Sequence, residues 1–92
     1  MIKSFKHKGL KKFFETGSTA GIDAKQAKKI STRLSVLNLA KEIGDIDLPG
    51  FFLHPLTGDR QGQWSITVTG NWRITFELSE GDVYIVNYED YH

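Results

Sequence analysis

Five side chains in the second half of the chain are of the types that can cleave RNA. They are His54, Arg73, Asp90, Tyr91 and His92. When a ribose 2′-OH attacks the adjacent phosphate, the reaction needs a general base, a general acid and positive charge for the developing phosphorane. Histidine transfers protons near neutral pH, and the planar fork of arginine holds a phosphate. This chemistry requires no metal ion and no cofactor.

The spacing of apolar residues predicts the strands that must position these groups. Three segments alternate apolar and polar residues: 64–69, 72–78 and 83–88. Such alternation is typical of antiparallel strands with one buried face. A three-residue loop, Thr69-Gly70-Asn71, puts every large apolar side chain of the first hairpin on one side. The predicted pairs are Val68–Trp72, Ile66–Ile74 and Trp64–Phe76. A two-residue loop at Gly70-Asn71 is rejected because it opposes Val68 to Arg73.

The second hairpin then determines which polar residues share the other face. Its predicted pairs are Leu78–Val83, Phe76–Ile85 and Arg73–Tyr88. The outer face holds Ser65, Thr67, Arg73, Thr75, Tyr84 and Tyr88, joined by Asp90 and His92 if the strand continues. His54 is not placed by this register, and strict alternation puts Tyr91 on the wrong side. The alternative is an ordinary solvated sheet face with a cross-strand contact between arginine and tyrosine.

Two helices are predicted before these strands. The first covers His7–Thr16 and stops at Gly17, and the second, about 20 residues long, begins at Asp23 and ends at Gly44. Short strands are predicted at 2–5 and 51–54. The expected fold class is therefore α+β: a single domain, residues 1–92, with a small antiparallel (mixed) sheet and two N-terminal helices on one face.

Charge is distributed unevenly along a chain whose net charge is only +1. Residues 1–41 carry ten basic and two acidic side chains, a net charge of +8, whereas residues 42–92 carry two basic and nine acidic ones, a net charge of −7. A lysine-rich half of this kind can bind a polyanion such as RNA. The candidate RNA-binding residues are Lys25, Lys28, Lys29, Arg33 and Arg60. The alternative is that these cations form the solvated faces of amphipathic helices.

Other function classes find less support in the sequence. The chain has no cysteine, which excludes disulfides, thiol nucleophiles and cysteine-ligated metals. A metal site built from His7, His54, His92 and Asp90 is disfavoured because no pair has helical or hairpin ligand spacing. Neither a nucleophile elbow nor a phosphate-binding loop is present. No apolar run is long enough to span a membrane and no secretory signal is visible, so a cytoplasmic location is expected.

Four motifs together resemble the HigB toxins of the RelE superfamily. They are residues 52–60 (FLHPLTGDR), 62–66 (GQWSI), 71–76 (NWRITF) and the terminal 87–92 (NYEDYH). The resemblance implies a RelE-like fold and cleavage of mRNA in the A site of the 70S ribosome. It also implies a HigA-type helix-turn-helix antitoxin, which binds operator DNA with the toxin attached, and no membrane partner. The family's active positions correspond to His54, Arg73, Asp90, Tyr91 and His92.

One position departs from the pattern of some HigB toxins, which have a lysine where this chain has Thr57. Threonine supplies no charge to the phosphate, so either Arg60 or Arg73 compensates or cleavage is weaker. The alternative to an endoribonuclease is a non-catalytic module that inhibits growth by binding the ribosome or RNA, or that acts as an antitoxin co-repressor.

Overall fold

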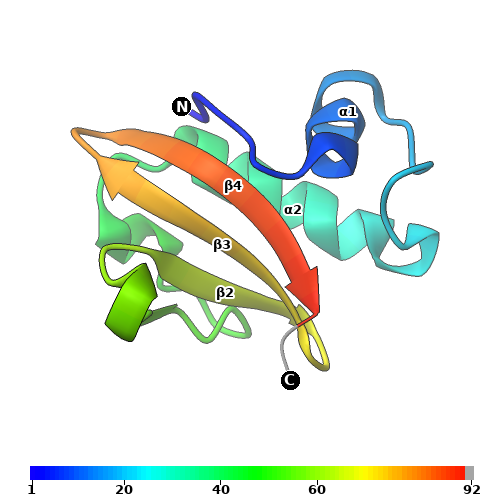
Figure 1. Ribbon diagram of the computed structural model, residues 1–92. Helices are drawn as coiled ribbons and strands as arrows, with labels where there is room; N and C mark the ends of the chain where they lie inside the picture. Colours follow the sequence, from blue (N-terminus) through cyan, green and yellow to red (C-terminus); the bar gives the residue numbers. More distant parts are fainter. Residues whose placement is uncertain (91–92) are drawn as a thin grey trace.

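The computed structural model describes residues 1–90 of the chain. Within that range four antiparallel strands form one sheet in the order β1-β2-β3-β4. Their bounds are His54–Pro55 (β1), Trp64–Thr69 (β2), Trp72–Ser79 (β3) and Asp82–Asp90 (β4). Helices α1 (Lys8–Thr16) and α2 (Ala27–Leu39) lie on one side of this sheet (Figure 1). The predicted α+β architecture is therefore confirmed.

The core lies between α2 and the sheet face that we call the inner face. Apolar residues repeat at helical spacing along α2, so Ile30, Leu34 and Leu37 point to the same side and are buried. They pack against strand residues that are fully buried as well: Ile66, Ile74, Phe76, Val83 and Val86. Burial of these side chains from both layers supplies the main stabilisation of a chain this short.

The N-terminal segment forms less strand than the sequence predicts. Residues 2–5 make only two isolated parallel bridges to β4, Ile2 with Val83 and Phe5 with Val86. They nevertheless cover the outer edge of β4, where the segment runs beside the strand (Figure 1). The predicted strand at residues 51–54 shortens to β1, because only His54 and Pro55 pair with β2.

Helix α1 begins and ends close to where the sequence predicts. The backbone N–H of Leu10 donates to Nδ1 of His7, which therefore caps the helix. Gly17 ends it in the left-handed conformation, with φ of 82°. Gly9 permits close packing, since a Cβ on Gly9 would stand 2.4 Å from the carbonyl oxygen of Gly21.

The second predicted helix is divided in the structure. Asp23 caps a short 3₁₀ turn, η1 (Ala24–Gln26), by accepting a hydrogen bond from the backbone N–H of Lys25. Helix α2 follows and ends at Leu39, because Ala40 is extended with ψ of 140°. The carboxylate of Asp45 then accepts hydrogen bonds from two backbone N–H groups, those of Lys41 and Glu42. These bonds start a second 3₁₀ turn, η2 (Ile43–Ile46), so the prediction that the helix continues to Gly44 is wrong.

The first hairpin has the predicted register at its open end and a different one at its turn. Trp64 pairs with Phe76 and Ile66 with Ile74, as predicted. The turn, however, contains only Gly70 and Asn71, and Thr69 rather than Val68 stands opposite Trp72. A β-bulge between Thr67 and Thr69 absorbs the extra residue, which keeps Val68 buried. The rejected two-residue loop is therefore the correct one.

A second bulge changes which face the end of β4 presents. Leu78 pairs with Val83 as predicted, but the register shifts between Thr75 and Glu77 of β3. The shift falls at Ile85 of β4, a β-branched residue with φ of 49°. Beyond the bulge, Val86 takes the buried position that the sequence assigned to Ile85.

Arg33 is also placed differently from its prediction. The sequence predicts Arg33 on the solvated side of the helix as an RNA-binding residue, but its exposed fraction is only 9%. Its Nε donates to the carbonyl of Thr67 at 2.6 Å, and its guanidinium lies 4.5 Å from the ring centroid of Phe51. Arg33 therefore ties α2 to the sheet.

Candidate active site

His54 and Arg73 lie on the same face of the sheet, the outer face opposite α2. His54 is opposite Ser65 on β2, and Arg73 is opposite Thr67, two residues further along the same strand. Directly paired residues of antiparallel strands project from the same face, as do residues i and i+2 of one strand. The structure therefore places His54, which the sequence could not, on the face of Arg73.

The environment of His54 defines which ring nitrogen can take up a proton. His54 is exposed, and its Nδ1 lies 3.0 Å from the backbone carbonyl oxygen of Phe52. A carbonyl oxygen only accepts hydrogen bonds, so Nδ1 carries the proton in this contact. In the neutral ring Nε2 is then the basic nitrogen, and it is directed away from that carbonyl.

A groove of about 170 Å³ adjoins His54. It is lined by His54, Pro55, Leu56, Thr57 and Arg60, and we call it the His54 groove. Arg60 belongs to a 3₁₀ turn, η3 (Gly58–Arg60), in the connection from β1 to β2. The position of Thr57 is thus beside an arginine, as compensation for a missing lysine would require.

Arg60 is nevertheless bound to a carboxylate that the sequence did not single out. Its guanidinium donates to both oxygens of Glu89, at 2.9 Å and 2.6 Å. It also donates to Oε1 of Gln63 and to Oγ1 of Thr75, and the latter hydroxyl donates to Glu89 at 2.7 Å. The hydrogen bond from Arg60 lowers the pKa of Glu89 against the opposing effect of burial, so the carboxylate is charged at neutral pH.

Tyr88 is on the inner face and not beside Arg73, so this predicted pair is wrong. The partner of Arg73 across the strands is Glu89, because the bulge at Ile85 shifts the register. Tyr88 is 5% exposed, stacks on Trp72 with centroids 4.5 Å apart, and donates to Oε1 of Gln26. Burial, and next the charge of Asp23, raise the pKa of Tyr88. Tyr88 is therefore a protonated structural residue.

Asp90 follows Glu89 and projects to the opposite side by strand alternation, the side of Tyr88. The expectation that Asp90 shares the outer face with Arg73 is therefore wrong for the described strand. Arg73 itself donates to Oγ1 of Thr67 at 3.3 Å. Tyr91 and His92, the last two predicted site residues, lie outside the described residues.

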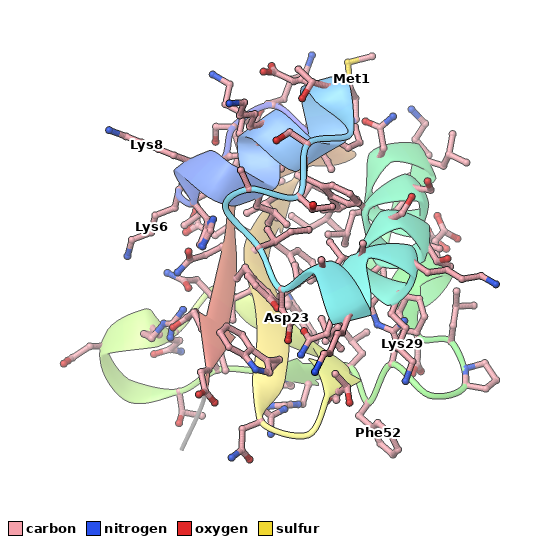
Figure 2. The ribbon with its side chains drawn as sticks, turned by 90° about the vertical axis from the view of Figure 1, so that its right-hand side faces the viewer. Met1, Lys6, Lys8, Asp23, Lys29 and Phe52 are labelled. Carbon is pink, nitrogen blue, oxygen red and sulfur yellow. The ribbon has the colours of Figure 1, made fainter. Side chains whose placement is uncertain are left out.

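A second groove of about 460 Å³ lies at the start of α2. It is lined by Asp23, Lys25, Gln26, Lys28, Lys29 and Thr69, and we call it the lysine groove. All three lysines are exposed, as their predicted role in RNA binding requires. Asp23 and Lys29 lie at this end of the molecule, whereas Lys6 and Lys8 project outward beside α1 (Figure 2).

Residues 1–90 lack the features of two other kinds of site. Among residues 1–90, no three His, Asp or Glu side chains gather closely enough to hold a metal ion. No helix in the same range is long and apolar enough to cross a membrane.

Comparison with known proteins gives a consistent family assignment. The sequence model for the family described as RelE-like toxin of type II toxin-antitoxin system HigB matches residues 3–92. Endoribonuclease HigB of Proteus vulgaris is 58% identical over 92 residues, covering all of both chains.

Two solved structures share the fold at much lower identity. YafQ from Escherichia coli BL21(DE3) has a TM-score of 0.58 at 18% identity, covering 98% of this chain and 91% of that one. The YoeB/ParE toxin from Agrobacterium tumefaciens has a TM-score of 0.55 at 18% identity, covering 96% of each chain. The RelE-like fold expected from the sequence is thereby confirmed.

Proposed function

The chain belongs to the HigB family of RelE-like toxins from type II toxin–antitoxin systems, and on this premise we propose that it is a ribosome-dependent mRNA endoribonuclease. It cleaves mRNA in the ribosomal A site and so stops translation. The observation that carries the proposal is the placement of His54 and Arg73 on one face of the sheet, in a chain that matches an endoribonuclease along its whole length.

In the proposed reaction the ribose 2′-oxygen attacks the adjacent phosphorus and the 5′-oxygen leaves. The products are a 2′,3′-cyclic phosphate and a 5′-hydroxyl end. Arg73 stabilises the extra negative charge of the phosphorane. His54 transfers one of the two protons through Nε2, and one of the terminal residues Tyr91 and His92 transfers the other. No metal ion or cofactor takes part in this scheme.

The lysine groove is proposed to bind ribosomal RNA. Its lysines are clustered and exposed, and their charge attracts phosphates without regard to sequence. Thr69 in this groove is two residues from Thr67, which accepts the hydrogen bond from Arg73. Two residues of strand span about 7 Å, so RNA held in the groove passes close to the outer face. Arg33 is not included, because its guanidinium is committed to backbone carbonyls.

Membership of a type II toxin family implies an antitoxin partner for this chain. The finer proposal is that this partner is a HigA-type helix-turn-helix protein. It would neutralise the toxin and bring it to operator DNA, which the toxin does not contact by itself.

The test is to map the 5′ ends of mRNA on programmed ribosomes with the wild type and with site variants. New 5′-hydroxyl ends in the A-site codon are expected with the wild type. Cleavage should fall by at least about 100-fold in Arg73→Ala, which removes the charge stabilisation, and also fall in His54→Ala and His92→Ala. An absence of cuts by the wild type, or full cutting by Arg73→Ala, contradicts the proposal.

A second candidate function is inhibition of the ribosome by binding alone. Thr57 in the His54 groove favours it, because this position offers no charge to a phosphate. If binding alone inhibits growth, toxicity survives Arg73→Ala and is lost when Lys28 and Lys29 are both replaced by Glu. If the protein acts as an endonuclease, by contrast, toxicity is lost in Arg73→Ala as well as in the variant with both lysines replaced.

A further inference from the structure

Arg60 and Glu89 are joined by a bidentate pair of hydrogen bonds across the outer face. Both carboxylate oxygens accept from the guanidinium, at 2.9 Å and 2.6 Å, in the fork geometry that arginine makes and lysine cannot. Arg60 comes from the connection that follows β1, at one edge of the sheet, and Glu89 from β4, the last strand in the order. The pair therefore bridges the two intervening strands.

Neighbouring side chains hold this pair in one geometry. Thr75 is 2% exposed beneath it, accepts from Nη2 of Arg60 at 3.2 Å and donates to Glu89. Gln63 accepts from both Nε and Nη2 of Arg60. The side chains of Arg60 and Glu89 are 34% and 25% exposed, so the pair is partly shielded from water. In this hydrogen-bond network the partners of the charged Arg60 guanidinium are side chains of the protein itself.

Each member of the pair lies next to one part of the candidate active site. Arg60 lines the groove that contains His54, and Glu89 is the cross-strand partner of Arg73. His54 itself stands on a strand of two residues that makes only two cross-strand pairs. The Arg60–Glu89 pair adds to these backbone pairs an anchor from the connection after β1 to the distant strand β4.

We propose that Arg60 and Glu89 are positioning residues for RNA cleavage. Their pair fixes the His54 groove relative to Arg73 and the end of β4, and it does not contact the scissile phosphate. The inference rests on the proposed function, and it replaces the expectation that Arg60 binds RNA. A positioning role predicts a loss of reaction rate, because small displacements of reacting groups cost large factors in rate.

The experiment measures cleavage of mRNA on programmed ribosomes for Glu89→Gln and Arg60→Lys. Each variant keeps the approximate size of its side chain and removes the bidentate geometry. The rate at saturating ribosome should fall by about 10- to 100-fold, while the ribosome concentration giving half the maximal rate should change by less than about threefold. Glu77→Gln is the matched control, because Glu77 is on the same face, two residues from Thr75, and loses the same charge. Its rate should equal that of the wild type.

Arg60→Lys separates positioning from RNA binding. A lysine attracts a polyanion about as well as an arginine does, so an RNA-binding role predicts nearly normal cleavage by this variant. Normal rates in both Arg60→Lys and Glu89→Gln overturn the inference, as does a change confined to the half-saturating ribosome concentration. Thermal unfolding verifies that each variant is folded. If one of the two variants is unfolded, the cleavage rate of the other tests the inference. Failure of the wild type to cleave contradicts the proposed function instead.

Discussion

Replacement of Arg33 by alanine tests whether this cation stabilises the fold or binds RNA. The substitution removes a charged hydrogen bond of 2.6 Å to Thr67, which contributes about 1.5–3 kcal/mol. It also removes the contact with Phe51, worth about 0.5–2 kcal/mol. Burial lowers the pKa of Arg33, but an arginine remains protonated in proteins. Part of the stabilisation by these two contacts therefore offsets the cost of desolvating the charged guanidinium. A net loss of about 2 kcal/mol should lower Tm by roughly 8–16 °C.

The assay is thermal and urea unfolding of Arg33→Ala beside Lys28→Ala and Lys29→Ala, followed by ribosome binding of the folded proteins. The two exposed lysines should change the free energy of unfolding by no more than about 0.5 kcal/mol and should weaken ribosome binding. Arg33→Ala should show the opposite pattern. If Arg33→Ala unfolds like the lysine variants and loses ribosome affinity while folded, Arg33 is an RNA ligand and our structural assignment is wrong.

Two further predictions follow from the packing and from the charge of Glu89. Gly9→Ala should destabilise the fold by about 1–3 kcal/mol, since its Cβ would meet the backbone of Gly21. Gly44→Ala should leave the free energy of unfolding unchanged, because no atom of the described residues lies within 4 Å of a Cβ at that position. Equal stability of the two variants in urea contradicts this prediction. Because Arg60 lowers the pKa of Glu89 below its ordinary value of 4.5, the stabilisation is complete above that value and is lost as pH falls through the lowered pKa. The difference in unfolding free energy between wild type and Glu89→Gln should therefore shrink from pH 7 to pH 3.5, and a constant difference refutes the assignment.

Apolar periodicity predicted the layers of the fold, because this pattern marks the side chains that become buried. The helix of residues 8–16 and the pairs Trp64–Phe76 and Ile66–Ile74 follow directly from the need to bury large side chains on one face. The length of the second helix was not predictable in this way. Helix α2 ends at Leu39, five residues before the predicted stop at Gly44, and the carboxylate of Asp45 binds the backbone N–H groups of Lys41 and Glu42 in the segment that follows.

The bulge at Ile85 explains most of the errors at the site. A bulge adds one residue to a strand, and it reverses the facing of every later side chain. Ile85 gives no sequence signal for this, since a β-branched residue is among the least expected at positive φ. One inserted residue thus moves Tyr88 to the buried face and brings Glu89 opposite Arg73. A register deduced from alternation alone fails wherever such a residue occurs.

The polar layer that Arg60, Glu89 and Thr75 form on the outer face could not be predicted for a different reason. Thr75 alternates with apolar residues as a solvent-facing residue does, yet it is buried beneath Arg60. Apolar patterns reveal a hydrophobic layer, whereas this layer consists of charged and polar groups that satisfy one another. Its central pair joins residues 29 positions apart, so no local spacing marks it. An ion pair that covers a polar sheet face can therefore be found only in three dimensions.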